Sequence, residues 1–84
     1  MDNKVDKISR SIRALEVVEV VVNADRTMTV ADIMTATGLP KATVHRLCGL
    51  LEQGGFLAPD IGGKGLTIGH RTRDLALGIM ALGG

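Results

Sequence analysis

The stretch TVADIMTATGLPKATVHRLCGLL, Thr29 to Leu51, decides the fold of this chain. Thr29 can cap the start of a helix, and Asp32 three residues later completes a variant of the capping box, which satisfies two otherwise unpaired backbone donors. The apolar residues behind this cap recur at helical spacing and are Val30, Ile33 and Met34. The stretch therefore predicts a short capped helix at its start.

A second helix is expected after a tight turn. Gly38 suits the left-handed position just past a helix end, which makes Thr37 the last residue of the first helix. Pro40 has its φ preset and lacks the N–H that a first helical turn leaves unpaired, so we expect the second helix to span 40–53. Two helices joined in this way predict a helix-turn-helix.

The second helix has an apolar side and a polar side. At about 100° per residue, the apolar residues cluster as Val44, Leu47, Cys48 and Leu51. The opposite side holds Ala42, Arg46, Gly49 and Gln53, with Thr43 and His45 on its flanks. Small residues allow close approach to a partner, and Arg46 is placed for a bidentate contact to guanine. Lys41 and Thr43 lie in the first turn, where donors can meet phosphate.

This polar side suits a DNA groove, provided that Arg46 is exposed and Leu47 is buried. The alternative is an ordinary amphipathic helix with a solvated outer side.

Composition excludes several classes of protein. The 84 residues suffice for one small domain. Aromatic content is 1%, so the core must be aliphatic, and the stacking platforms typical of single-stranded nucleic acid binding are missing. A single cysteine cannot form an internal disulfide and favours a cytoplasmic setting. No apolar run reaches the roughly 20 residues that a membrane span needs.

Charge is distributed unevenly along the chain. The formal net charge is +1, but residues 1–40 carry a net charge of −1 and residues 41–73 a net charge of +3. Positive charge therefore gathers in the second helix and the segment after it, which is the pattern expected of a nucleic-acid footprint.

A long helix is expected from about Lys7 to Asn23, after a flexible polar segment 1–6. Its main apolar side consists of Ile8, Ile12, Leu15, Val18 and Val22, widened by Val17, Val20 and Val21. The run VVEVVV alone could form a strand, since β-branched residues are weak helix formers, but the periodic residues before it favour a helix. The width of the apolar side indicates burial on more than one side, against a second subunit or at the centre of a monomer.

Two short apolar runs, Phe56–Ala58 and Leu66–Ile68, flank a segment rich in Gly and Pro. They predict a β-hairpin with a flexible tip, which after a helix-turn-helix is a wing. Lys64 at the tip could touch phosphate or a minor groove, or could be a solvated lysine in an ordinary turn.

A helical pattern returns from Thr72, with Leu75, Ala76, Ile79, Met80 and Leu82. We expect 71–84 to begin a linker helix toward a further domain; pairing with the first helix is the alternative. The predicted fold is mainly α with a small β-hairpin (α+β), a winged helix-turn-helix over 7–70 with a C-terminal linker helix.

Catalysis and metal binding have little support. His45 and Cys48 are spaced to share a metal, but Cys48 lies on the apolar side, where a buried thiol is expected. No C-x-x-C pair completes a zinc site. Lys64 is followed by Gly65, so GGKG does not complete a phosphate loop. We expect no enzyme, no cofactor and no metal. The alternative function is a winged helix used for protein–protein assembly, which predicts an apolar or acidic outer face.

Nearly the whole chain resembles the N-terminal winged helix-turn-helix domain of the isocitrate-lyase-regulator (IclR) family of bacterial transcription regulators. The resemblance rests on SIRALEVVEVV (Ser11–Val21), TVADIMTATGLPKATVHRLCGLLEQGGFL (Thr29–Leu57) and LTIGHRTRDLALG (Leu66–Gly78). Its most specific part is LPKATVHRL. The resemblance implies a domain that binds operator DNA as a homodimer, often within a tetramer. It also implies a C-terminal domain that senses a small-molecule effector, and regulation, usually repression, of catabolic genes.

The resemblance also implies roles for particular residues. The groove-facing residues would be Lys41, Thr43, His45 and Arg46, with Ala42 and Gly49 as the small residues beside them. From the resemblance, Arg13 would contact the DNA backbone near the start of the first helix. Thr29, Lys64 and Arg71 are further candidates for contacts to the backbone or from the wing. Lys64 matches a basic wing only loosely, because the tip is variable in composition.

Overall fold

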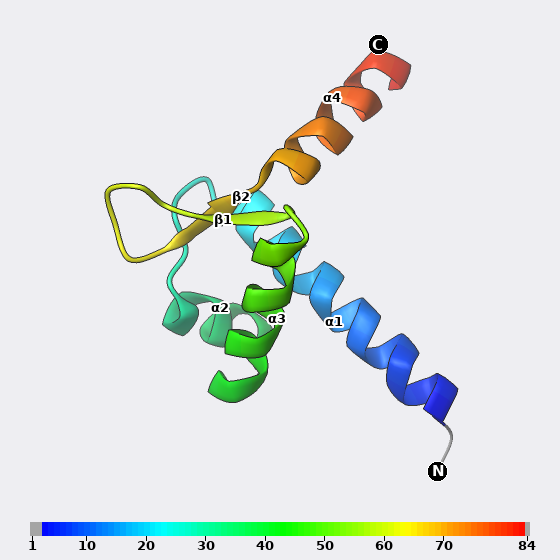
Figure 1. Ribbon diagram of the computed structural model, residues 1–84, viewed down its shortest axis with the longest axis vertical. Helices are drawn as coiled ribbons and strands as arrows, with labels where there is room; N and C mark the ends of the chain where they lie inside the picture. Colours follow the sequence, from blue (N-terminus) through cyan, green and yellow to red (C-terminus); the bar gives the residue numbers. More distant parts are fainter. Residues whose placement is uncertain (1–2, 84) are drawn as a thin grey trace.

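The computed structural model describes residues 3–83. Its elements are, in order, α1 (Asn3–Asn23), α2 (Val30–Thr37), α3 (Lys41–Gln53), β1 (Leu57–Pro59), β2 (Leu66–Ile68) and α4 (His70–Gly83). Helices α1, α2 and α3 form the body, the hairpin β1–β2 projects from it, and α4 points away (Figure 1). This arrangement confirms the predicted winged helix-turn-helix.

The cap and the turn of the helix-turn-helix form as their residues predict. The Thr29 hydroxyl accepts a hydrogen bond from the Asp32 N–H at 3.1 Å, and the Asp32 carboxylate accepts one from the Thr29 N–H at 3.0 Å. Gly38 has φ +75°, and its N–H donates to the Met34 carbonyl at 2.8 Å. A residue with a side chain is strained at such a φ, so glycine defines where α2 ends.

The predicted start of the second helix is wrong by one residue. Pro40 has φ −65° but an extended ψ of 154°, so it is the N-cap, and α3 begins at Lys41. The Pro40 carbonyl accepts the first helical bond, from the Val44 N–H at 3.0 Å. Proline's fixed φ fits both positions, and only ψ distinguishes them.

Helix α1 is longer than predicted and buries a different side. It begins at Asn3, earlier than the expected Lys7, and it is helical through the valine run to Asn23. Val17 and Val21 are buried, whereas the predicted main apolar side is largely exposed, at 49–62% for Ile8, Ile12, Leu15 and Val22. Ala14 on the same side of α1, and Ala24 just after its end, are partly buried and pack against the core. The small and β-branched side chains on this side allow α2 and α3 to pack closely against α1.

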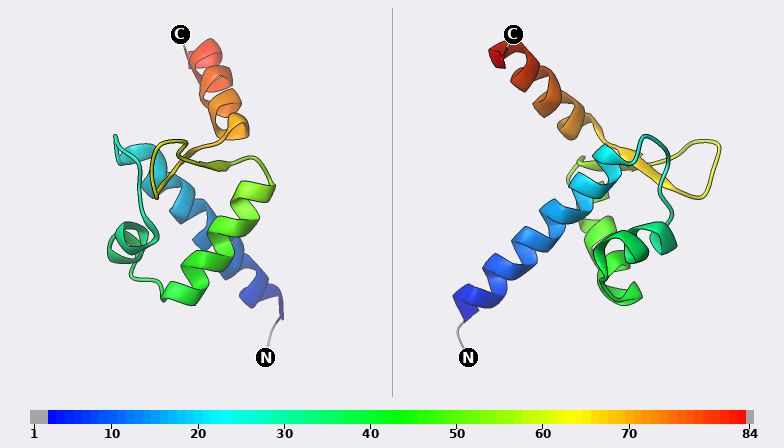
Figure 2. Two further views of the ribbon diagram at one scale, coloured as in Figure 1. Left: turned by 60° about the vertical axis from the view of Figure 1, so that its left-hand side comes forward. Right: turned by 180° about the vertical axis from the view of Figure 1, so that it is seen from behind.

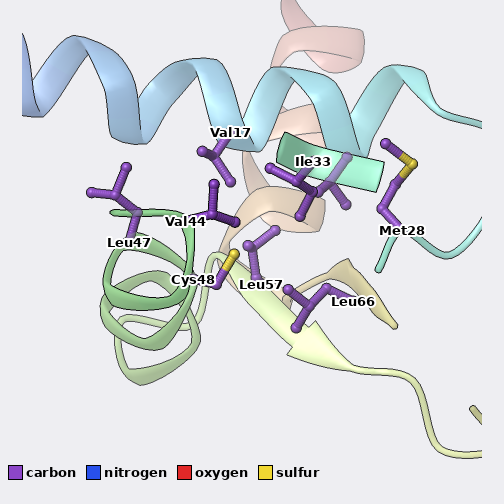
Figure 3. Close-up of a cluster of buried hydrophobic side chains, with 9 residues drawn as sticks. Val17, Met28, Ile33, Val44, Leu47, Cys48, Leu57 and Leu66 are labelled. Carbon is purple, nitrogen blue, oxygen red and sulfur yellow. The ribbon is translucent and has the colours of Figure 1, made fainter. Parts of the chain in front are cut away.

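One aliphatic core joins the helices to the hairpin. Figure 3 shows Val17 of α1, Val44 of α3 and Leu57 of β1 pointing into a shared interior. The buried hydrophobic residues are Val17, Val21, Met28, Ile33, Val44, Leu47, Cys48, Leu57 and Leu66. Cys48 is a buried thiol, as predicted, and burial, with a smaller contribution from Glu52, raises its pKa.

Hydrogen bonds tie the hairpin to the body and α4 to the hairpin. Strands β1 and β2 pair antiparallel, and Met28 extends the pairing through two bonds with Leu66, at 2.7 and 3.0 Å. Both strands were predicted; the predicted bounds of β1, Phe56–Ala58, are one residue earlier than the observed ones. Helix α4 begins at His70 rather than Thr72, and the buried Thr72 hydroxyl donates to the Phe56 carbonyl at 2.6 Å. Beyond this anchor α4 stands clear of the body (Figure 2).

Within residues 3–83, no helix has both the length and the hydropathy that crossing a membrane demands.

Candidate nucleic-acid interface

Helix α3 turns its predicted polar side outward. Val44, Leu47 and Cys48 are buried, and Leu47 is only 5% exposed, whereas its neighbour Arg46 is exposed. The predicted groove-facing residues that are exposed are Lys41, Ala42, His45, Arg46 and Gly49; Thr43 is half-buried. This orientation confirms the condition that the sequence analysis set for a DNA-facing helix.

The wing lies along one flank of α3. A hollow of about 400 Å³ between the helix and the hairpin is lined by residues that include His45, Gly49 and Glu52 of α3 and Lys64 of the wing. The structure therefore brings Lys64 close to the outward face of α3. Sequence reasoning placed Lys64 at the hairpin tip but gave no means of placing that tip beside His45.

Helix α1 lies along the other flank of α3. A hollow of about 510 Å³ between the two helices is lined by Ser9, Arg10, Arg13, Thr43, Arg46 and Leu47. Arg13, which the resemblance singled out, is thus gathered with Thr43 and Arg46. Sequence reasoning missed Arg10. The signal that could have found it is its spacing of three residues from Arg13, which places both side chains on one side of a helix.

Two of the predicted contact residues are engaged within the domain. The Thr29 hydroxyl caps α2, as described above. The Arg71 guanidinium lies over the Phe56 ring, 4.5 Å from its centroid, and donates to the Gly54 carbonyl at 3.4 Å. Arg71 lines a separate hollow with Phe56, Asp74 and Leu75, so it is not gathered with the α3 face. DNA contacts by Thr29 and Arg71 stay predictions.

Electrostatic interactions support the N-terminal cap of α2. The Thr29 backbone N–H first, and then the Arg26 side chain, lower the pKa of Asp32 below its ordinary value of 3.8. Arg26 also forms an ion pair with Asp32 at 3.0 Å. Asp32 is therefore held ionised, as its role in the capping box requires. In the part of the chain that the structure describes, no three His, Cys, Asp or Glu side chains gather where they could hold a metal ion.

Comparison with known proteins identifies this arrangement. The sequence profile of the IclR helix-turn-helix domain matches residues 12–60, which include α2, α3 and the residues of α1 that enter the core. The chain belongs to the IclR helix-turn-helix family. The match ends before Lys64, so the wing tip and α4 lie outside it.

One curated protein and two solved structures illustrate what the chain is similar to. The probable transcriptional regulator SauR of Cupriavidus necator is 31% identical over 74 residues, which are 88% of this chain and 29% of SauR. An IclR homolog from Microbacterium sp. strain HM58-2 is 33% identical with a TM-score of 0.70, over 81% of this chain and 28% of that one. The Agobacterium tumefaciens repressor BlcR is 22% identical and shares the fold at a TM-score of 0.75, over 95% of this chain and 32% of BlcR. This chain spans less than a third of the length of each.

Proposed function

We propose that this domain binds operator DNA in a sequence-specific manner and so regulates transcription, as a repressor of metabolic or catabolic genes. The observation that carries the proposal is the outward face of α3, which is cationic and built partly from small residues, while the apolar side of the helix is buried. Membership of the IclR helix-turn-helix family supports the same function.

In this proposal α3 lies in the major groove. Phosphate contacts supply most of the affinity, and a few side chains on α3 select the sequence. Arg46 is the proposed guanine contact, worth about 1–3 kcal/mol of discrimination when bidentate. Lys41, Thr43 and His45 lie around it, and Lys64 of the wing approaches the DNA beside His45.

A second copy of the chain is part of the proposal. The exposed apolar side of α1, centred on Leu15, points away from the core and offers a surface that a partner α1 could cover. Two copies would place their α3 helices in successive major grooves, with half-sites about 34–36 Å apart. Sedimentation at several concentrations tests this: Leu15→Glu should shift the chain toward monomer, and an unchanged self-association would exclude this face as the interface.

For the whole protein we propose a cytoplasmic regulator in which residues 71–84 connect this domain to one that binds a small-molecule effector. The support is that α4 leaves the body with exposed Leu75, Ile79 and Leu82 along one side, as a helix covered by further protein would. The greater length of the relatives agrees with this.

The competing function is a winged helix that docks on another protein. Leu50, 58% exposed beside the α3 face, is the observation in its favour. The salt dependence of the affinity distinguishes the two functions. For DNA, the logarithm of the association constant falls with the logarithm of the salt concentration, at a slope of about −0.9 per phosphate contact. If the chain binds a protein partner with an affinity that does not change with salt concentration, the competing function is supported.

The decisive experiment selects bound duplexes from a random DNA pool, using the chain fused to an artificial dimerisation helix. Arg46→Ala should relax the selected sequence at one base pair, while Arg73→Ala, a matched loss of an exposed cation on α4, should leave the selected sequence unchanged. Failure to enrich any sequence would overturn the proposal. Equal weakening of all sequences by Arg46→Ala would assign Arg46 to phosphate.

A further inference from the structure

The first turn of α4 is bonded to the turn that follows α3. The Gly69 N–H donates to the Phe56 carbonyl at 2.9 Å. The Arg71 N–H donates to the Gly55 carbonyl, also at 2.9 Å. The buried Thr72 hydroxyl donates to the Phe56 carbonyl at 2.6 Å, so both lone pairs of this oxygen are used. The Arg71 guanidinium stacks on the Phe56 ring, and the start of α4 is therefore attached at several points.

The turn itself is bonded back onto α3. The Phe56 N–H donates to the Leu51 carbonyl at 2.9 Å, and the Gly55 N–H donates to the Glu52 carbonyl at 3.1 Å, which is the pattern of a Schellman motif. Gly55 has φ +83°, and a Cβ on it would overlap the His70 ring, so glycine permits the close approach of α4. The end of α3, the turn and the start of α4 form one connected unit, the α3–α4 joint (residues 54–56 and 69–72).

The joint gives α4 a second attachment besides the chain itself. Along the chain, α4 follows β2 after the single residue Gly69. A helix held at one such point can swing, because a few backbone dihedral angles absorb the change in direction. Swinging of α4 would break the hydrogen bonds at Phe56. Beyond Thr72 the helix stands clear of the body, so its direction is set at the joint (Figure 2).

We propose that the α3–α4 joint fixes the half-site spacing that a pair of these domains accepts on DNA. The proposal rests on the proposed function, in which two copies place α3 in successive major grooves and α4 leads to a further domain. When further protein holds the far ends of two α4 helices at a set distance, rigid joints pass that distance on to the two α3 helices.

Phe56, Arg71 and Thr72 are then positioning residues, which select the spacing and leave the base sequence of each half-site to α3. The surroundings of Arg71 agree with a role inside the domain. Asp74 lines the same hollow as Arg71, and its carboxylate repels DNA phosphate.

The functional test fuses the chain, through a continuous helix after α4, to a parallel dimerising coiled coil. Affinity is measured for a duplex with the preferred half-site spacing and for one lengthened by about five base pairs, which turns one half-site by about half a helical turn. The parent should bind the lengthened duplex about 100-fold more weakly or worse, because the gain from engaging both half-sites, about 10²–10⁴-fold, is lost when geometry forbids it. The double variant Phe56→Leu/Thr72→Val should lose less than about ten-fold, since a loosened joint lets the second half-site engage.

Three controls accompany this comparison. Arg73→Gln removes an exposed cation from the same helix and should behave as the parent. The unfused parent and the unfused double variant should bind a single half-site equally, and circular dichroism should show that both are folded. If the double variant does not fold, Arg71→Gln, which changes an exposed side chain of the joint, replaces it in the same comparison.

A parent that binds both spacings equally, or a folded joint variant that keeps the full preference of the parent, would overturn the role of the joint and leave the proposed function standing. A parent that binds neither the duplexes nor a single half-site would overturn the proposed function, and the spacing role with it.

A measurement without DNA tests the rigidity of the joint by itself. Spin labels are placed at Leu50→Cys on α3 and Met80→Cys on α4, both exposed positions, in a chain that carries Cys48→Ala. Double electron–electron resonance should give one narrow distance distribution for the parent and a broader one for the joint variant. Distributions of equal width would overturn the joint whatever the chain does on DNA.

Discussion

Replacing Gly49 with alanine should stabilise the domain and at the same time weaken its binding to DNA. It lies within α3 on the outward face, and a Cβ built there meets no heavy atom within 4 Å. Glycine in a helix interior is about 0.8–1.0 kcal/mol less favourable than alanine. Gly49→Ala should therefore stabilise the domain by about 1 kcal/mol, which raises Tm by roughly 4–8 °C for a domain of this size.

The same methyl group should weaken DNA binding. The proposed groove contact brings the α3 backbone close to the DNA where Ala42 and Gly49 leave room, and a methyl inserted into a packed contact costs typically 1–3 kcal/mol. Affinity for the selected duplex should then fall by about five-fold or more.

Thermal unfolding followed by circular dichroism and fluorescence anisotropy with a labelled duplex measure the two effects. Gly78→Ala in α4 is the matched control, since that glycine also has open space around it, and it should leave duplex affinity unchanged. If Gly49→Ala were more stable and bound as tightly as the parent, the α3 backbone would not approach DNA at this point. A lower Tm would refute the reasoning about the helix itself.

Three further predictions concern the helix-turn-helix and the core. Gly38→Val should cost about 1–3 kcal/mol, because a β-branched residue is strained at φ +75°; retention of full thermal stability would mean that the turn does not need a left-handed residue. Asp32→Asn should lower stability at neutral pH and lose its effect in acid. The folded pKa of Asp32 is below 3.8, so its contribution is complete above that value and disappears as pH falls through the lower folded pKa. Denaturation from pH 2 to pH 7 measures the free energy of unfolding of the parent chain and of Asp32→Asn. A difference between the two that stays the same in acid would contradict the prediction. Ile33→Ala should cost about 2–5 kcal/mol in urea denaturation, because Ile33 is fully buried; a loss under 1 kcal/mol would place it outside the core.

The winged helix-turn-helix was predictable from the sequence because its cap and its turn depend on local chemistry. The Thr29–Asp32 cap and the Gly38 turn each depend on residues a few positions apart, so their hydrogen bonds follow from residue type and spacing. The start of α3 was wrong by one residue because proline fixes φ and leaves ψ free.

The buried side of α1 could not be chosen from the sequence. The helix is apolar on two sides, and the side with the larger residues, Ile12 and Leu15, was favoured over the one with Val17 and Val21. The choice depends on how closely α2 and α3 can approach α1, which is a property of the assembled domain.

The candidate site was predictable along α3 and incomplete around it. The exposed position of Arg46 followed from helical periodicity. The gathering of Arg10 and Arg13 beside Thr43, and of Lys64 beside His45, joins residues distant in sequence and required the fold. The stacking of Arg71 on Phe56 had no local signal either.

The central claim is that the outward face of α3 contacts duplex DNA. Titration of the ¹⁵N-labelled chain with a selected duplex, followed by amide chemical shifts, tests it most directly. We predict that the largest changes fall on residues 41–46 and 49, with smaller changes at Arg10, Arg13 and Lys64, and that residues 75–82 of α4 stay unchanged. Shifts confined to α4 or to the exposed apolar side of α1, with α3 unaffected, would contradict the account.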